Sequence, residues 1–287
     1  MELRKASRKK SKIRMGLQGP SGSGKSYSSL LIAYGLCKDW SKIAVIDTES
    51  NSADLYSHLG PFNVLNLSQP FTPEKYIDAI RLCEKSMEVV IIDSVSHEWE
   101  GIGGVLSIHA GMSGNSFTNW GKLTPRHNAF IQSILQSGCH VIATIRSKQD
   151  YVLNEKNGKL IPEKVGLKGV TRKGLDFELT IVLNLDMKNN ASCTKDRTGL
   201  FFNETEFKPT IETGKKILAW CNEGLDADKE IKEMLAKIQS AVSVDELISL
   251  FKITPYQDQL LGDFSKRRHQ LEASLVNVKS SKNGTAK

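Results

Sequence analysis

Short apolar runs alternate with amphipathic segments along most of the chain, and this alternation predicts its elements. Runs typical of buried strands lie at residues 13–18, 42–47, 63–67, 89–93, 139–145 and 179–185, with one more strand candidate at 199–207. Apolar residues at helical spacing predict helices over 25–37, 73–87 and 125–136. Strands that alternate with helices indicate an α/β fold with a mainly parallel sheet flanked by helices and joined by right-handed crossovers.

The pattern changes at both ends of this α/β region. Residues 1–12 are polar and basic and predict an arm, which leaves 13–223 as the core. Amphipathic helical patterns at 227–242, 244–251 and 255–276 predict a small helical appendage over 224–276, and 277–287 has the composition of a disordered tail.

Two segments inside the core lack a clear period. Residues 101–118 contain five glycines, which predicts a mobile or ligand-dependent loop. Residues 149–174 are basic and contain Asn157-Gly158, a pair typical of a hairpin turn.

The residues between the first strand and the first helix carry the clearest chemical signal. They match the pattern G-x-x-x-x-G-K-S, and a strand, a glycine-rich turn and a helix are the context that this pattern requires. A glycine-rich turn with an unrelated lysine is the alternative, but all fixed positions and both flanks agree. Backbone N–H groups at a helix N-terminus attract phosphate. We therefore predict binding of ATP through Gly19, Pro20, Ser21, Gly22, Ser23, Gly24, Lys25, Ser26 and Tyr27.

A nucleotide site of this kind also holds Mg²⁺. Lys25 is expected to reach the β- and γ-phosphates, and the Ser26 hydroxyl is expected to bind the metal. A second, acidic metal residue should close a buried strand beside the phosphate-binding loop. Asp93 closes Val89–Ile92, the most β-like run of the chain, and we favour it over Asp47, which closes another strand.

Hydrolysis further needs a base or a water-positioning group near the γ-phosphate. Glu49 lies just beyond the strand that follows the phosphate-loop helix. Glu98 and Glu100, which follow Asp93, are the competing candidates, and a solvated loop acid is the plain alternative for Glu49.

Composition and charge narrow the class of protein. Of 287 residues, 39% are hydrophobic and 25% charged, which is ordinary for a soluble globular protein. No apolar run approaches the length of a bilayer span, and the basic N-terminus lacks the apolar segment of a secretory signal. We therefore expect a cytoplasmic protein without membrane partners. The five scattered cysteines indicate reduced thiols and neither a disulfide framework nor a zinc site.

Basic residues are concentrated in three segments. Residues 1–14 carry seven Lys/Arg against one acidic residue, 148–174 carry seven against three, and 265–287 carry six against one, although the net charge is only +7. An acidic body with basic segments suits a protein that binds a polyanion. Solvated tails and a solvated loop give the same pattern, so charge alone leaves both readings open.

Several longer motifs together resemble one group of proteins, the phage-encoded RecA-like ATPases of the AAA-ATPase type, close to the Sak-type single-strand annealing proteins. The resemblance covers residues 10–205. Its motifs are GPSGSGKSYSSLLIA from Gly19, DTE at 47–49, IIDSVSHEWEG at 91–101, NWGKLTPRHNAFIQSIL at 119–135, CHVIATIRSKQDYVL at 139–153, GLKGVTRKGLDFE and KDRTG. It implies a RecA-like core, binding of ATP and Mg²⁺, and a role in phage recombination or replication in the bacterial host cytoplasm, alongside a single-strand DNA-binding protein.

The resemblance also implies roles for individual residues. Glu49 takes the place of the catalytic glutamate, and Thr144 the place of a γ-phosphate sensor, where a glutamine is more usual. Lys195 and Arg197 resemble the K-x-R motif that DnaB-type helicases insert into a neighbour's site, which implies a homo-oligomer, ring or filament; a basic turn is the alternative. Single-stranded DNA is expected at loops 103–120 and 149–174, with basic contacts from Arg146, Lys148, Lys164, Lys168, Arg172 and Lys173, and stacking candidates Phe117, Trp120 and Tyr151.

Three functional classes fit these features to different degrees. The favoured reading is an oligomeric ATPase that binds single-stranded DNA and promotes annealing or strand pairing. The alternative is a helicase-loader or packaging-type ATPase that acts mainly on a protein partner through the helical appendage. A small-molecule kinase fits least, because it needs an arginine-bearing lid over a second substrate.

Overall fold

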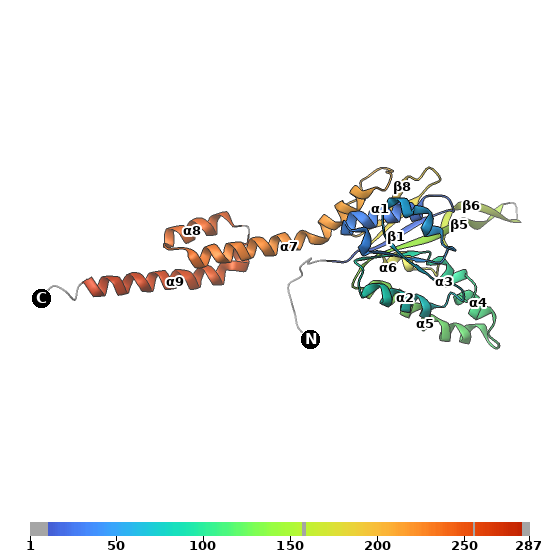
Figure 1. The fold of residues 1–287 in the computed structure, drawn as a ribbon, viewed down its shortest axis with the longest axis horizontal. Coiled ribbons are helices and arrows are strands. Elements are labelled where there is room, and N and C mark those ends of the chain that lie inside the picture. Colours follow the sequence, from blue (N-terminus) through green and yellow to red (C-terminus); the bar gives the residue numbers. More distant parts are fainter. Residues whose placement is uncertain (1–10, 157–158, 255, 283–287) are drawn as a thin grey trace. The chain divides into compact units, whose positions relative to one another are not determined.

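The computed structural model describes residues 11–156, 159–254 and 256–282, without the side chains of residues 149–167, 224–228, 258 and 274–282 (Figure 1). The chain forms two compact units, an N-terminal unit of residues 11–221 and a C-terminal unit that begins at Asn222. The boundary falls inside one long helix.

The N-terminal unit is built on a mostly parallel sheet, as the alternating pattern predicts. The strand order is β3-β2-β4-β5-β1-β7-β8, and β6 pairs with β5 outside this path. Among the described residues, the β5–β6 and β7–β8 pairings are antiparallel and the other pairings are parallel. The strands are β1 (Arg14–Gly19), β2 (Ile43–Asp47), β3 (Asn63–Asn66), β4 (Val89–Asp93), β5 (His140–Lys156), β6 (Lys159–Gly169), β7 (Ile181–Leu185) and β8 (Ala191–Asp196).

Helices cover both faces of this sheet (Figure 1). The first part of α7 packs with α1 on one face, and α2 and α5 pack on the other. The helices are α1 (Lys25–Cys37), α2 (Pro73–Glu84), α3 (Ser96–Glu100), α4 (Val105–Ala110), α5 (Ser116–Gln136), α6 (Leu175–Glu178), α7 (Ile211–Ser240), α8 (Val244–Ile253) and α9 (Gln257–Lys282), with 3-10 helices at Trp40–Lys42 and Ser52–Leu59. The architecture is therefore an α/β core, a mostly parallel sheet flanked by helices, followed by further helices.

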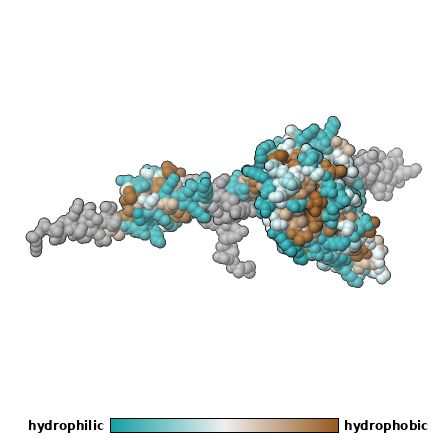
Figure 2. Space-filling model, viewed as in Figure 1, coloured by the Kyte–Doolittle hydropathy of each residue, from teal (hydrophilic) through white to brown (hydrophobic). Residues whose placement is uncertain are grey.

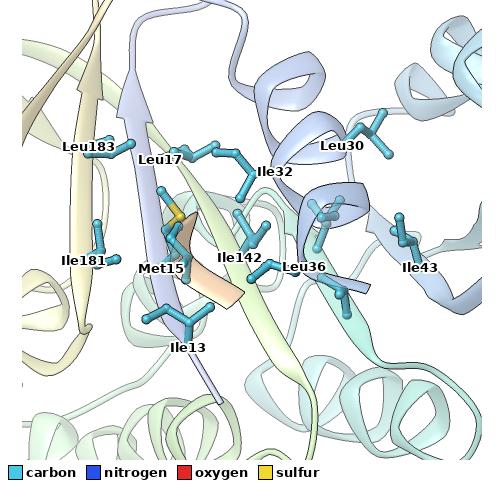
Figure 3. Close-up of a cluster of buried hydrophobic side chains, with 14 of the residues drawn as sticks. Ile13, Met15, Leu17, Leu30, Ile32, Leu36, Ile43, Ile142, Ile181 and Leu183 are labelled. Atoms are coloured by element: carbon cyan, nitrogen blue, oxygen red, sulfur yellow. The ribbon is translucent and has the colours of Figure 1, made fainter. Parts of the chain in front are cut away.

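Two apolar clusters, one on each face of the sheet, form the core. Met15 and Leu17 of β1 point to the cluster shared with Leu30 and Ile32 of α1 (Figure 3). On the opposite face the apolar side chains of β4 and β5 meet α2 and α5. Because successive strand residues point to opposite faces, a strand buried on both sides must be apolar throughout, which explains the continuous apolar runs in the sequence. All five cysteines lie in this unit, and none of them forms a disulfide bond.

The strand predicted at 139–145 is longer than its apolar run. β5 continues to Lys156 and pairs antiparallel with β6, with Lys156 opposite Lys159. The predicted hairpin is therefore present, and its two turn residues, 157 and 158, lie outside the described residues. Apolar composition marks only the buried part of β5, because the remainder pairs with β6 alone.

The glycine-rich segment 101–118 is not one irregular loop. It contains α4 and the first turn of α5, and α5 begins nine residues before Pro125, where the pattern placed the start of the helix. The Asn115 side chain caps α5 by accepting a hydrogen bond from the Phe117 N–H at 2.8 Å. Pro125 removes one backbone donor, and burial of Leu123 and Phe130 on either side offsets that loss.

Three further boundaries differ from the sequence pattern. The strand candidate at 199–207 forms only an isolated bridge between Phe207 and Ala191, and the strand of this region is β8. The first helix of the predicted appendage is the second half of the continuous helix α7. α9 extends to Lys282, into the predicted tail, because no glycine or proline interrupts the chain between residues 263 and 282.

The C-terminal unit has a small core of its own. Ile238, Ala241, Leu247, Leu260 and Phe264 are buried together where α7, α8 and α9 meet. Within the described part of the chain, no helix combines the length and the apolarity that a membrane span requires.

Candidate nucleotide-binding site

At two positions, the loop between β1 and α1 has a backbone conformation that only glycine adopts without strain. Gly22 and Gly24 have φ angles of 82° and 78°, in the left-handed region. Gly19 needs the absence of a side chain for another reason, because a Cβ there would lie 2.7 Å from the Leu185 carbonyl oxygen. The loop therefore passes close to β7 and curls over the N-terminus of α1, where N–H groups converge.

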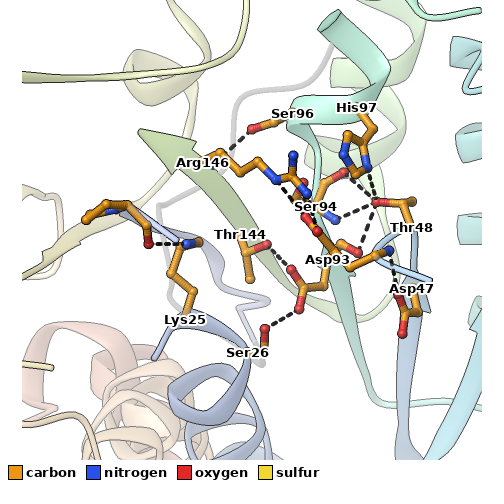
Figure 4. Close-up of polar contacts among 12 residues, drawn as sticks. Lys25, Ser26, Asp47, Thr48, Asp93, Ser94, Ser96, His97, Thr144 and Arg146 are labelled. Atoms are coloured by element: carbon orange, nitrogen blue, oxygen red, sulfur yellow. Dashed lines mark hydrogen bonds and ion pairs between the residues drawn. The ribbon is translucent and has the colours of Figure 1, made fainter. Parts of the chain in front are cut away.

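Asp93, the last residue of β4, links this strand to α1 and β5 at the base of the loop (Figure 4). Its Oδ2 accepts a hydrogen bond from Ser26 Oγ at 2.5 Å, and its Oδ1 accepts one from Thr144 Oγ1 at 2.6 Å. Only 3% of Asp93 is exposed, and burial raises the pKa of its carboxyl. A hydroxyl and a carboxylate are hard oxygen donors of the kind that Mg²⁺ prefers, so Ser26 and Asp93 fit a magnesium site.

The competing acid Asp47 binds backbone N–H groups of the turn that follows it. Its two carboxylate oxygens accept hydrogen bonds from the N–H groups of Glu49 and Ala53 at 2.6 and 2.8 Å. It holds the turn that presents Glu49 and does not line the phosphate-loop pocket. This geometry favours Asp93 over Asp47 for a metal.

Lys25 is folded onto its own loop. Its Nζ donates a hydrogen bond to the Pro20 carbonyl oxygen at 2.8 Å. Burial lowers the pKa of Lys25, and the negative charges of Asp93 and Glu49 act against this shift. Lys25 is 9% exposed and faces two carboxylates. Its ammonium group can therefore leave the Pro20 carbonyl oxygen and bind phosphate oxygens when a nucleotide is present.

Glu49 faces the same pocket and is paired with Arg146. Arg146 Nε donates to Glu49 Oε1 at 2.8 Å, the second guanidinium nitrogen donates to Oε2, and Ser94 Oγ donates to Oε1 at 3.1 Å. Burial raises the pKa of Glu49, but Arg146, together with His97 and Ser94, outweighs burial and lowers the pKa overall. Glu49 is therefore an ionised carboxylate at the mouth of the pocket.

The two other acid candidates lie elsewhere. Glu98 is buried and paired with His127, whose Nδ1 lies 3.1 Å from its carboxylate oxygens. Glu100 pairs with Lys148 at 3.8 Å. Neither lines the phosphate-loop pocket. The geometry thus selects Glu49 among the candidates for a base.

The pocket contains seven of the predicted nucleotide, metal and catalytic residues, together with Arg146, which was predicted as a DNA contact, and two residues that were not predicted. Ser52 and Tyr56, from the 3-10 helix after Glu49, line it, and they carry no motif that would have marked them in the sequence. Thr144 touches Asp93 from behind the pocket, and Tyr27 packs against Tyr56 with ring centres 5.9 Å apart. The lining residues are Ser21, Gly22, Gly24, Lys25, Ser26, Glu49, Ser52, Tyr56, Asp93 and Arg146.

Lys195 and Arg197 lie away from this pocket, at the end of β8. Arg197 donates to the Phe177 carbonyl oxygen at 3.0 Å, and Lys195 Nζ donates to the carbonyl oxygens of Asp176 and Phe177. Both therefore hold α6 against the sheet edge, and the fold does not bring them to the nucleotide pocket of their own chain.

The predicted DNA contacts separate into groups. Arg146 faces Glu49 inside the nucleotide pocket, and the side chains of Lys164 and Tyr151 lie outside the described residues. Lys168, Arg172 and Lys173 line a second pocket, which also includes Gln18 and Thr171.

The aromatic candidates differ in exposure. Phe117 is 87% exposed. Trp120 stacks on His109 with ring centres 4.2 Å apart, and the Arg172 guanidinium lies 5.9 Å from the Trp120 ring centre. Phe117 is thus available for stacking, whereas Trp120 is already packed.

Comparison with known proteins places this site in a family. Curated protein sequences give no match. One similar solved structure is described as a prototypical ATPase from the type III secretion system of pathogenic bacteria; it is 14% identical, with a TM-score of 0.34, over 61% of this chain and 51% of that one. This chain thus spans about half the length of that structure. The model of the AAA domain family matches residues 11–222, and this chain therefore belongs to the AAA domain family of P-loop ATPases.

Proposed function

We propose that this protein hydrolyses ATP and, as a homo-oligomer, binds single-stranded DNA and promotes annealing or strand pairing in recombination or replication of phage DNA. The observation that carries the proposal is the convergence of Lys25, Ser26, Asp93 and Glu49 on one pocket at the carboxyl ends of parallel strands. Nucleotide sites of open α/β sheets lie at that edge.

Each of these side chains has a separate task. Lys25 neutralises the β- and γ-phosphates, and the loop N–H groups hold their oxygens. Ser26 and Asp93 would hold Mg²⁺, which supplies charge neutralisation of the phosphates when it is bound. Glu49 accepts the proton of the attacking water, so that hydroxide character develops only at the γ-phosphorus.

A basic surface next to the nucleotide pocket supports the DNA part of the proposal. Lys168, Arg172 and Lys173 gather where the β5–β6 hairpin returns to the sheet, around Gln18 of β1. β5 itself runs from Thr144, at the nucleotide site, into this hairpin. Cations that follow a backbone, with an exposed aromatic such as Phe117, suit a single strand without sequence preference.

Removal of the three cations tests the DNA part. In the triple variant Lys168→Ala, Arg172→Ala, Lys173→Ala, the affinity for a fluorescein-labelled oligothymidylate should fall, and the slope of log affinity against log salt should decrease by about 2. The matched control removes equal charge at Lys42, Lys75 and Lys85. Anisotropy titrations that give equal affinities and slopes for both triple variants would exclude this surface as the DNA site.

A different observation favours the protein-partner alternative. An apolar groove between α8 and α9 contains Leu247, Phe251 and Phe264, and its rim residues Ile248 and Leu261 are about half exposed. Figure 2 shows hydrophobic residues at the surface of the C-terminal unit. Under this alternative, Ile248→Glu with Leu261→Glu abolishes function in phage replication and leaves the DNA affinity of the purified protein unchanged. Under our proposal, function is retained in this variant.

A further inference from the structure

The Glu49–Arg146 contact occupies the carboxylate that the proposed hydrolysis needs. One edge of the guanidinium, Nε and a terminal nitrogen, donates to the two carboxylate oxygens, a two-pronged geometry that Lys could not reproduce. The backbone N–H of Arg146 is fixed in turn by Ser96 Oγ at 2.9 Å. While this pair is intact, Oε1 of Glu49 accepts hydrogen bonds from Arg146 and Ser94 and Oε2 accepts one from Arg146, so most of the acceptor sites of the carboxylate are already engaged and Glu49 is a weaker base for water.

The same guanidinium lines the phosphate-loop pocket together with Lys25, and its positive charge lowers the pKa of Lys25 (Figure 4). A terminal phosphate bound by Lys25 presents oxygens that suit a guanidinium as well as a carboxylate does. The Arg146 and Glu49 side chains are 41% and 22% exposed, so solvent reaches both partners and the pair is not sealed in the core.

We infer that Arg146 is a positioning residue. When a nucleoside triphosphate binds, the Arg146 guanidinium leaves the Glu49 carboxylate and binds the terminal phosphate instead. This exchange releases Glu49 to act on water. The inference rests on the proposed nucleotide site and adds its regulation. A diphosphate lacks the group that Arg146 would move to, so the Glu49–Arg146 pair persists when a diphosphate is bound. Glu49 is thus withheld from water until a triphosphate is present.

Removing Arg146 and removing the charge of Glu49 should change the affinity for a triphosphate in opposite directions. A merely structural ion pair would not give this result. Arg146→Ala removes the phosphate ligand, so affinity for a triphosphate falls by about 10- to 100-fold, the size expected for a lost charge-assisted hydrogen bond. Glu49→Gln removes the competitor of the phosphate, so affinity for a triphosphate rises several-fold. Neither change alters affinity for a diphosphate.

The chain offers a matched control pair. Arg126 and Glu74 form a similar two-pronged contact, with N–O distances of 2.7 and 2.8 Å, away from the nucleotide pocket. Arg126→Ala and Glu74→Gln should leave both affinities unchanged. Arg146→Lys, which keeps the charge, should recover part of the triphosphate affinity.

The experiment measures dissociation constants of fluorescent AMP-PNP and ADP for the unsubstituted protein and the five variants, in the absence of DNA. Opposite shifts for AMP-PNP alone support the exchange. Shifts of the same sign in Arg146→Ala and Glu49→Gln, no shift, or equal shifts for both nucleotides overturn it. An unsubstituted protein that binds neither nucleotide would instead refute the nucleotide site and the exchange with it, whereas a failure to bind DNA would not affect this result.

Discussion

Burial and hydrogen bonding act against each other at Asp93. Burial raises the pKa of its carboxyl, while hydrogen bonds from Ser26 and Thr144 favour the ionised form. A cation at this position would relieve the cost of the buried negative charge. The buried charge of Asp93 therefore favours binding of a metal ion in the pocket together with the nucleotide.

His140 gives the folded protein a pH dependence that lies outside the active site. Its Nδ1 accepts a hydrogen bond from the Ile13 N–H at 3.2 Å, and burial lowers its pKa to about 3. The unfolded chain, with a pKa of about 6.5, takes up this proton first as the pH falls. Stability from this residue is therefore complete above about pH 6.5 and is lost progressively towards pH 3.

We expect this residue alone to lower the free energy of unfolding by about 2 kcal/mol between pH 7 and pH 5. His140→Asn should remove that part of the loss, since Asn keeps an acceptor for Ile13 and does not titrate. Urea unfolding at both pH values measures it. An undiminished pH difference in His140→Asn would assign the effect to other groups.

The sequence predicted those site residues that belong to a local motif. The loop from Gly19 to Ser26 is contiguous, and Asp93 ends a run of four apolar residues, so both could be recognised without a structure. The Arg146 contact joins residues 97 positions apart, and no local pattern specifies such a pair. Ser52 and Tyr56 were missed for the same reason, because pocket lining depends on how the chain returns after Glu49.

Among the elements, α1 and α7 meet through two glycines. A Cβ on Gly35 would lie 2.2 Å from the Ile211 carbonyl oxygen, and a Cβ on Gly214 would lie 2.1 Å from the Ile32 carbonyl oxygen. The two backbones thus touch directly at the face of the sheet that carries the phosphate-loop helix. This contact fixes the axis of α1, and with it the direction in which Lys25 and Ser26 point.

Gly35→Ala should therefore lower the free energy of unfolding by about 1–3 kcal/mol, as expected for an added methyl group without space. Gly121→Ala is the matched control, because Gly121 is also helical and has no atom within 4 Å of the added Cβ. That control should be stabilising by about 0.5–1 kcal/mol. Thermal and urea unfolding compare the two, and equal effects would show that α1 and α7 are not in close contact.

Buried elements were predictable, and elements that depend on distant partners were not. β2 and β4 are apolar on both faces up to their final aspartate, and β7 is apolar except for Asn184, which gives a local signal of the sheet. β8 is an edge strand with the polar sequence ASCTKD, and it is ordered by pairing with β7 rather than by its own composition. α4 is a short helix that glycines flank on both sides, so its period was hidden.

At the scale of the whole molecule, Arg146 is the one arginine among the described residues that line the nucleotide pocket, and it is paired with Glu49. Arg197 lies at the sheet edge of its own chain, where it donates a hydrogen bond to the Phe177 carbonyl oxygen of α6. An arginine that stabilises the transition state of phosphoryl transfer accelerates it by about 10³–10⁵-fold. We propose that Arg197 does so in the pocket of a neighbouring copy.

Mixing of two inactive variants tests this arrangement. Arg197→Ala and Lys25→Ala should each lose ATP turnover, and their mixture should regain part of it, because some interfaces combine an intact pocket with an intact Arg197. Arg81→Ala, another exposed arginine, should retain turnover. An Arg197→Ala protein with unreduced turnover, or a mixture as inactive as its components, would place the complete site within one chain.

The most direct test of the account is ATP turnover by Glu49→Gln, measured beside the unsubstituted protein with and without single-stranded DNA. The account predicts that the unsubstituted protein releases phosphate, faster with DNA. It also predicts that Glu49→Gln retains AMP-PNP binding but releases phosphate at least about 100-fold more slowly, the loss expected when a general base is removed. Turnover of Glu49→Gln at the rate of the unsubstituted protein would contradict the account.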